Sequence, residues 1–485
     1  MDYLSIFRQL TNIPRPSHHE EKVADFLCQF AIDHNLTYRR DANNCVVIEK
    51  PASSGYEDHE PVVLLNHMDM VCVSEADKPF NPQTSTITPI TYEKDGETWM
   101  RADGTSLGAD NGIGLSMALA ILADDTIQHP ALEVLTTTNE EDGMSGAAGL
   151  SPDFIKGRRV LNLDSEAYDE ITVASAGAYM QKAKLPYNRI AIPKDYIAYE
   201  VSVFGGKGGH SGVDINRGRG NAIKILANLL LVAIRQLNIK LYLVSFYGGQ
   251  AAAAIPGEAE AKVIIPSDQQ EAFETLVRQC DDAVQAQYSE TDPTLEVTFD
   301  QSVWNGMVVN EEGTHLLLAS LNAIPTGPVK MMDNANPLDD SSSYVETSNN
   351  IGVVKQSNNA FTVYIHTRSF NIDAMHDVAR NISQIFTLTG AEVECQMDLS
   401  PWQEDTDSPL ISQTIDTFQQ VLGFKPKKVS MHFALEAGYY VEKFPGITIA
   451  SIGPRILYPH STHECVSLTT ANNIWQVVIE LLKKL

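Results

Sequence analysis

Several apolar segments of this chain end in acidic or imidazole side chains, and this feature limits its fold more than any other. Four segments are rich in β-branched residues and leucine, as buried strands are: PVVLLNHMDM (61–70), ALEVLTTT (131–138), GRRVLNLD (157–164) and GITIASIG (446–453). Between the first two lies NGIGLSMALAILADD (111–125), a helix by its continuous apolar stripe. Alternating strands and helices predict a doubly wound α/β sheet, with its working residues at the carboxyl ends of the strands.

The middle of the chain has a different pattern. Strands with polar–apolar alternation are expected at 195–206, 240–249, 260–266 and 360–370, separated by helices at about 220–237, 268–288 and 312–324. After residue 397 long helices return, at 410–422 and 470–484. We therefore predict a catalytic domain that is split in sequence (1–179 and 397–485), with an α+β domain (180–396) inserted between its halves.

Composition excludes several classes of function. A length of 485 residues favours two domains, and a formal net charge of −27 argues against a nucleic-acid partner. Apolar runs of about 18 residues are missing from the sequence, so we expect no membrane span. The first residues lack the basic and apolar regions of a signal peptide, which predicts a cytoplasmic location. The six cysteines form no CxxC pair, which excludes a thiolate zinc site.

Candidate metal ligands follow the predicted strands. His67 and Asp69 are two residues apart on a strand and so share a face, where the carboxylate could orient the imidazole. Asp110 stands in a glycine-rich turn before a helix, a position that would also suit an N-cap. Asp164 ends an apolar strand, where a charge is costly unless it is paired or bound to a cation.

Two adjacent glutamates, Glu140 and Glu141, follow the strand at 131–138. Neighbouring side chains on a strand point to opposite faces, so alternation would send the two carboxylates in different directions. One could then bind a metal while the other faces a water molecule, although alternation does not say which. After the last strand, His460 is the candidate ligand and His463 competes with it.

The number of candidate ligands suggests two metal ions. Two histidines, two aspartates and one glutamate are too many for one tetrahedral zinc and too few for two closed sites. One bridging carboxylate would give each of two metals an imidazole, its own carboxylate and the shared one, leaving a place for water. Such ligands suit zinc, with cobalt or manganese as alternatives. The pattern therefore predicts a two-metal hydrolase.

Six motifs in one order and spacing carry a family resemblance: NHMDMV, GADNGIG, NEEDGMSGA, LNLDSE, GGKGGHSG and PHSTHE. The chain resembles the di-zinc metallopeptidases of the carnosinase and aminoacylase type, and among them the bacterial aminoacyl-histidine dipeptidases. The likeness covers nearly the whole chain. It implies a zinc-binding α/β catalytic domain with an inserted α+β lid domain, and a homodimer formed through that lid.

The resemblance also implies which residues bind the two divalent ions. Asp110 bridges the metals, His67 and Asp164 complete one site, and Glu141 and His460 complete the other.

The remaining implied roles are catalysis and substrate binding. Glu140 is the general base that deprotonates the water held between the metals, and Asp69 orients the neighbouring histidine ligand. His210, in GGKGGHSG, donates to the tetrahedral oxyanion, and in the family this histidine comes from the partner subunit's lid. Arg368 grips the terminal carboxylate of the dipeptide, and Glu436 lies near its free amino group.

One segment departs from the family pattern. Where the family has a sequence like GGTxRNAIPREA, this chain reads GGQAAAAIPGEA (248–259), so Ala252 and Ala253 replace an arginine and an asparagine. The alanine run Ala251–Ala254 leaves the preferred dipeptide open. The leading hypothesis is a metal-dependent dipeptidase that cleaves Xaa-His or a broader range of dipeptides. The alternatives are an N-acyl amino acid amidohydrolase of the same fold and a metal-containing protein that binds peptides without hydrolysing them.

Overall fold

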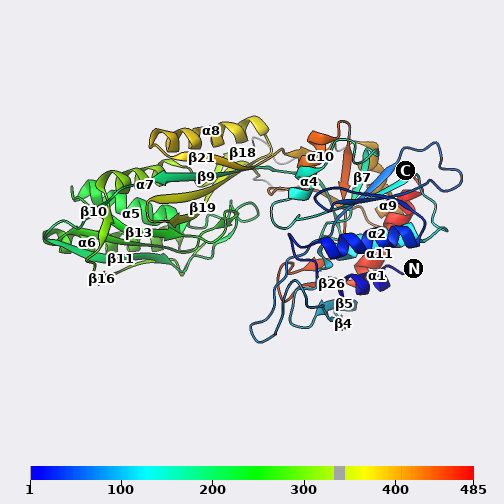
Figure 1. Ribbon diagram of the computed structural model, residues 1–485, viewed down its shortest axis with the longest axis horizontal. Coiled ribbons are helices and arrows are strands. Elements are labelled where there is room, and N and C mark those ends of the chain that lie inside the picture. Colours follow the sequence, from blue (N-terminus) through cyan, green and yellow to red (C-terminus); the bar gives the residue numbers. More distant parts are fainter. Residues whose placement is uncertain (1, 333–343, 406) are drawn as a thin grey trace. The chain divides into compact units, whose positions relative to one another are not determined.

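The computed structural model describes residues 2–332, 344–405 and 407–485. The chain forms two compact units (Figure 1). Unit 1 consists of Met1–Ala174, Trp402–Ser430 and Glu436–Leu485, and unit 2 consists of Ser175–Pro401 and Met431–Leu435. The boundaries between the units lie at 174/175 and 401/402, whereas the boundaries predicted from the sequence lie at 179/180 and 396/397.

The main sheet of unit 1 has the strand order β1-β2-β6-β3-β7-β24-β8-β22, with β23 beside β8. These strands are β1 (Thr37–Arg40), β2 (Val46–Lys50), β3 (Val62–His67), β6 (Leu132–Thr137), β7 (Arg159–Asn162), β8 (Glu170–Ser175), β22 (Trp402–Gln403), β23 (Lys427–Met431) and β24 (Thr448–Ser451). Pairing is parallel between β3 and β6, β3 and β7, and β7 and β24. The four apolar segments that the sequence analysis singled out therefore lie side by side and end at one edge of the sheet.

The predicted α/β fold of unit 1 is confirmed, with one difference. β2 and β8 flank the four parallel strands in antiparallel pairing, so the sheet is mixed. The helices are α1 (Tyr3–Leu10), α2 (Glu21–Asp33), α3 (Ala109–Ala123), α4 (Ser145–Gly149), α9 (Pro409–Leu422), α10 (Ala437–Lys443) and α11 (Leu468–Leu482). A smaller sheet joins β25 (Ile456–Leu457), β26 (Cys465–Ser467), β5 (Glu97–Ala102) and β4 (Pro89–Lys94).

Unit 2 is an antiparallel sheet with helices packed against it. Its strand order is β16-β11-β15-β13-β19-β20-β9-β21, with β18 beside β19. The strands are β9 (Gly177–Pro186), β11 (Tyr196–Phe204), β13 (Tyr242–Gly248), β15 (Ala259–Pro266), β16 (Glu296–Ser302), β18 (Gly327–Met331), β19 (Val345–Gln356), β20 (Ala360–Ser369) and β21 (Glu392–Leu399). Short pairs are formed by β10 (Arg189–Ala191) with β17 (Met307–Val309) and by β12 (Gly209–His210) with β14 (Ala254–Ile255).

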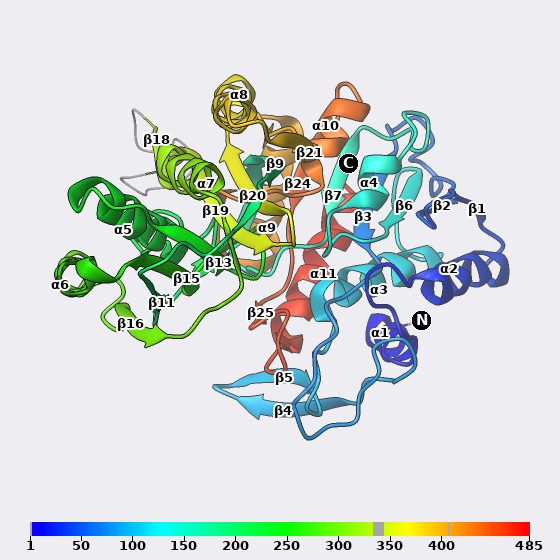
Figure 2. The same ribbon diagram turned by 60° about the vertical axis from the view of Figure 1, so that its left-hand side comes forward.

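The helices of unit 2 are α5 (Ala222–Gln236), α6 (Gln270–Tyr288), α7 (Glu311–Ala323) and α8 (Ile372–Leu388). They lie along one face of the sheet (Figure 2), and their apolar residues join those of the strands in one core. The α+β pattern expected for this region is therefore present in unit 2. In the described ranges, every helix is too short or too polar to cross a bilayer.

Candidate active site

Five of the predicted residues meet at the carboxyl edge of the unit 1 sheet. His67 ends β3, and its Nε2 lies 3.0 Å from Asp110 Oδ1 and 3.2 Å from Asp164 Oδ1. His460 Nε2 lies 3.2 Å from Asp110 Oδ2 and 2.8 Å from Glu141 Oε2. The two oxygens of Asp110 thus face two different imidazoles, and each imidazole also faces a second carboxylate.

This donor set fits a pair of divalent cations. His67, Asp110 and Glu141 offer ligand atoms that all lie within 4.8 Å of one another. Glu141 Oε1 is buried and receives no hydrogen bond from the described residues. A buried carboxylate oxygen without a donor is costly unless a cation or a proton compensates it. Because Asp110 has an imidazole–carboxylate pair on each side, the residues fit two ions that share its carboxylate.

The pKa values of the cluster show the same demand for positive charge. Burial raises the pKa of Asp164 to about 7, although the neighbouring His67 opposes the shift. Burial alone would lower the pKa of His460, but hydrogen bonds to Asp110 and Glu141 outweigh it and raise that pKa to about 11. In the absence of a cation the cluster holds protons, because its carboxylates are too close to be left uncompensated.

Asp110 reaches the cluster from the first turn of α3. Gly108 is the N-cap of this helix, so Asp110 does not take the capping role that the sequence also allowed. The Asp110–Asn111 peptide bond is cis. The Asn111 amide donates to Leu163 O at 2.7 Å, which ties the start of α3 to the end of the neighbouring strand region.

The two adjacent glutamates separate for a different reason from the one expected. β6 ends at Thr137, so Glu140 and Glu141 lie in a turn and strand alternation does not apply to them. The chain enters this turn through Asn139, which has a φ of 55°. Glu141 then faces His460, whereas the Glu140 side chain has no hydrogen bond or ion pair to any described residue. Burial, together with nearby carboxylates, raises the pKa of Glu140 well above its ordinary value.

Asp69 organises both sides of this arrangement. It is fully buried, and its Oδ1 lies 3.5 Å from His67 Nδ1. The same carboxylate accepts the N–H groups of Glu140 at 3.1 Å and Glu141 at 3.2 Å, and the Ser17 hydroxyl at 2.7 Å. Asp69 therefore lies beside an imidazole and holds the backbone of the two glutamates, a link that the sequence did not reveal.

Glu436 and His463 complete the predicted residues of unit 1. Glu436 is buried, and its Oε2 accepts hydrogen bonds from Thr137 at 2.9 Å and Tyr440 at 3.2 Å. Its Oε1 is buried without a donor among the described residues, and burial raises its pKa to about 8. The side chain of His463 is exposed and takes no part in the cluster, in contrast to His460.

Arg368 and His210 lie in unit 2. Arg368, on β20, is 3% exposed, and no carboxylate of a described residue pairs with it. Its guanidinium lies 3.4 Å from Ser211 Oγ and from His366 Nδ1. A buried cation without a counter-charge is costly, so this position suits an anionic group.

The His210 ring has a defined tautomer. Its Nδ1 accepts the N–H groups of Gly212 at 3.2 Å and Val213 at 3.1 Å, so Nε2 carries the proton of the neutral ring. Burial, with the charge of Arg368, lowers the pKa of His210 to about 4. The neutral ring therefore presents Nε2–H as a hydrogen-bond donor.

Residues 63–484 match the model of peptidase family M20/M25/M40. The chain belongs to this peptidase family. It is 34% identical over 481 residues to the cytosol non-specific dipeptidase of Escherichia coli K12, a match that covers 99% of this chain and 96% of the relative. The crystal structure of the aminoacylhistidine dipeptidase from Vibrio alginolyticus has a TM-score of 0.82 and 34% identity, covering 100% of this chain and 96% of the other. A Staphylococcus aureus tripeptidase, with a TM-score of 0.57 and 15% identity over 99% of this chain and 97% of the other, shares the fold. The predicted family resemblance is confirmed.

Sequence reasoning missed two histidines of unit 2 near Arg368. His366 precedes Arg368 by two residues on β20 and so shares its face, a spacing that could have been noticed. His432 comes from a distant segment, and its Nε2 lies 2.8 Å from Ser348 Oγ. Only the folded chain brings His432 to this position.

The buried histidines of unit 2 are expected to destabilise the protein in acid. Burial, with the charge of Arg368, lowers the pKa of His432 to about 3 from an ordinary value of 6.5. The unfolded chain therefore takes up the proton first as pH falls, so the stabilisation is present above pH 6.5 and is lost between about pH 6.5 and 3. For His432, the loss of unfolding free energy between pH 7 and pH 5 is about 2 kcal/mol.

Urea unfolding of the metal-free protein at these two pH values measures this effect. We expect His432→Asn to reduce the pH dependence of the unfolding free energy. His376→Asn replaces a partly exposed histidine beside Asp398 and controls for the substitution itself. Equal pH dependence in His432→Asn and the wild type would show that His432 is not the group responsible.

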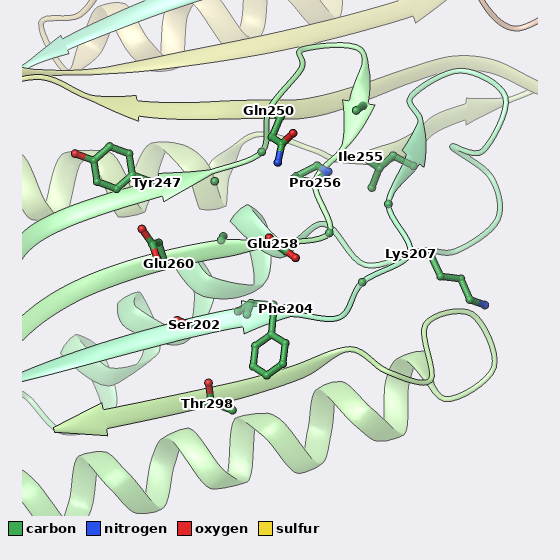
Figure 3. A pocket seen from close by; sticks show the side chains of 18 residues that line it. Ser202, Phe204, Lys207, Tyr247, Gln250, Ile255, Pro256, Glu258, Glu260 and Thr298 are labelled. Carbon is green, nitrogen blue, oxygen red and sulfur yellow. The ribbon is translucent and has the colours of Figure 1, made fainter. Parts of the chain in front are cut away.

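A groove of about 730 Å³ lies elsewhere in unit 2, over the ends of β11, β13 and β15. Figure 3 shows Glu260 on the middle strand, between Tyr247 and Ser202 on its neighbours. The groove borders the alanine run at Ala254, but none of the predicted site residues lines it. The groove is therefore lined by other residues than the predicted site, although its Ala254 pairs with His210 between β14 and β12.

Proposed function

We propose that this chain is a metal-dependent dipeptidase that hydrolyses Xaa-His or a broader range of unblocked dipeptides. The observation that carries the proposal is the Asp110 carboxylate, whose two oxygens face two imidazole–carboxylate pairs. Membership of the M20/M25/M40 family and full-length likeness to two proteins named dipeptidases support it. The name of the Escherichia coli relative also supports a cytosolic location.

Two divalent ions, with zinc as the first choice and cobalt or manganese as alternatives, belong to the proposal. His67 and Asp164 would hold one ion, Glu141 and His460 the other, and Asp110 would be shared. When bound, the ions supply the Lewis acidity that polarises a peptide carbonyl and makes water nucleophilic near neutral pH.

Glu140 is the general base and acid of this proposal. Its carboxylate is free of the hydrogen bonds that occupy Asp69, and it lies among the charges of the cluster. Because its pKa is raised, Glu140 can take a proton from the attacking water and pass it to the leaving amine near neutral pH. A carboxylate of ordinary pKa would take up that proton from water less readily.

Binding of the two ends of the dipeptide and of the oxyanion is assigned to three further residues. Glu436 would bind the free ammonium group, since its Oε1 is buried without a donor among the described residues. Arg368 would bind the terminal carboxylate, and His210 would donate its Nε2–H to the developing oxyanion. Unit 1 as catalytic domain, unit 2 as lid and dimerisation through unit 2 follow from the family resemblance.

A substrate panel tests the proposal. Zinc-loaded protein is given β-Ala-His, other Xaa-His dipeptides, dipeptides without histidine, a tripeptide and N-acetyl amino acids, each with and without a chelator. Chelator-sensitive hydrolysis of free dipeptides supports the proposal. A preference for N-acetyl amino acids would instead identify an amidohydrolase, and binding of dipeptides without hydrolysis would identify a binding protein.

Arg368→Met is expected to raise KM for dipeptides by roughly 30-fold or more, because loss of a buried charge-assisted pair costs about 2 kcal/mol or more. The same change at Arg380, an exposed residue of α8 paired with Asp377, is the control and should leave KM unchanged. Steady-state kinetics on one dipeptide and its C-terminal amide separate the two ends of the substrate. If Arg368→Met keeps the wild-type preference for the free acid over the amide, Arg368 does not bind the terminal carboxylate.

A further inference from the structure

Arg15 is a buried cation that contacts two loops of the candidate metal centre. It is 2% exposed and forms no ion pair with a carboxylate of the described residues. Its Nη1 donates to Met68 O at 2.9 Å and to Asp69 O at 2.8 Å, just after β3. Its Nη2 donates to Gly108 O at 2.5 Å, just before Asp110. One guanidinium therefore links the loop that carries Asp69 to the loop that carries Asp110.

Glu464 holds the second loop through its N–H groups. This carboxylate is 2% exposed, and its Oε2 accepts from Leu107 at 2.7 Å and from Gly108 at 2.9 Å. Its Oε1 accepts from Ala109 at 2.7 Å and lies 3.4 Å from Asp110 N. Consecutive N–H groups of the loop thus converge on one buried carboxylate, while the Gly108 carbonyl is bound by Arg15.

Two glycines make room for the guanidinium. Gly108 has a φ of 68°, and a Cβ there would lie 2.6 Å from Arg15 Nη2. A Cβ at Gly112 would lie 2.7 Å from the same nitrogen. The close approach of Arg15 to the backbone therefore depends on glycine at both positions, in the turn that the sequence motif GADNGIG provides.

We propose that Arg15 and Glu464 are a positioning pair that fixes the Asp110 carboxylate relative to His67 and Asp69. The inference rests on the proposed two-metal function. Neither side chain contacts a ligand atom of the cluster, so both act through the main chain of the loops that carry those ligands. A planar guanidinium can bond carbonyls of two loops at once, whereas the single ammonium of lysine cannot reproduce that geometry.

Arg159 offers a matched control. Like Arg15, it donates to main-chain oxygens of two separate segments, those of Leu485 at 2.7 Å and of Glu60, and its Nε also lies 3.5 Å from the Glu60 carboxylate. It stands at the start of β7, at the opposite end of the strand from the metal cluster. Arg15→Lys and Arg159→Lys therefore remove similar hydrogen bonds, but only the first alters the loops of the cluster.

The test is a titration of metal-free protein with Co²⁺, followed by its visible absorption, alongside thermal unfolding and dipeptide kinetics. We expect Arg15→Lys to weaken Co²⁺ binding by roughly 10- to 100-fold, the usual effect of losing a group that orients metal ligands. We also expect a lower kcat at an almost unchanged KM. Arg159→Lys should bind Co²⁺ with wild-type affinity, even if its thermal stability falls as much as that of Arg15→Lys.

A second variant keeps the test decisive if Arg15→Lys does not fold. Glu464→Gln preserves the volume of the side chain but replaces one of its two acceptor oxygens with an NH₂ donor that faces N–H groups. It should therefore weaken Co²⁺ binding to a similar degree. Wild-type Co²⁺ affinity in either folded variant, or equal weakening in Arg159→Lys, would overturn the positioning role. A wild-type protein that binds no Co²⁺ would instead refute the proposed function on which the inference rests.

Discussion

Replacing Glu140 with glutamine is expected to lower kcat for dipeptide hydrolysis by roughly 10²- to 10⁴-fold, the usual contribution of a general base. The bound metal should remain, because the Glu140 side chain has no contact with the imidazoles of the cluster, whereas Glu141 lies 2.8 Å from His460. Glutamine keeps the size of the side chain and removes only its ability to accept a proton. Metal content per chain and kcat, measured on the same preparation, check both parts of the expectation.

The neighbouring substitution, Glu141→Gln, is the matched control. It alters the same kind of side chain one residue away, but we expect it to weaken metal binding as well as turnover, since this carboxylate faces His460 and Asp110. Equal metal content with equal loss of kcat in the two variants would mean that the two glutamates have been assigned the wrong roles.

Asp110→Asn is expected to cost the protein both metals. One oxygen of this carboxylate faces His67 at 3.0 Å and the other faces His460 at 3.2 Å, so an amide group would weaken both half-sites at once. Loss of the negative charge also removes part of the attraction for two cations that would repel each other at close range. We expect less than one metal per chain after dialysis, and no measurable hydrolysis.

Elemental analysis of dialysed protein measures this outcome. Asp103→Asn, which changes an exposed aspartate of unit 1 paired with Lys78, should retain the wild-type metal content. A variant at Asp110 that keeps one metal at wild-type affinity would show that the carboxylate belongs to one half-site and does not bridge.

Much of the fold could be predicted from local patterns in the sequence. β3, β7 and β24 are buried on both faces over most of their length, which is typical of the parallel centre of an α/β sheet. β19 escaped prediction because its first half contains the buried polar run Thr347–Asn350, which has neither an apolar run nor alternation. β19 forms a hairpin with β20, and on its other side it pairs with β13, where Val354 lies opposite Gly248, a contact between distant segments that local composition does not encode.

The candidate site could be predicted only in part, for a similar reason. Ligand types and their order along the chain indicated two metals, and the family resemblance assigned Glu140 and Glu141. The reason offered for their separation was wrong, because β6 ends before them and a turn redirects the chain. The buried groups that support the site act through main-chain hydrogen bonds. Those of Asp69 and Glu464 connect residues that are far apart in sequence, so no spacing could reveal them.

The central claim is that two metal ions sharing Asp110 make this chain a dipeptidase. Stepwise addition of zinc to metal-free protein, with β-Ala-His or another dipeptide cleaved by the zinc-loaded enzyme as substrate, tests it most directly. We predict that hydrolysis requires added metal and reaches its plateau at two equivalents of zinc per chain. A plateau at one equivalent, or hydrolysis that persists in metal-free protein, would contradict the account.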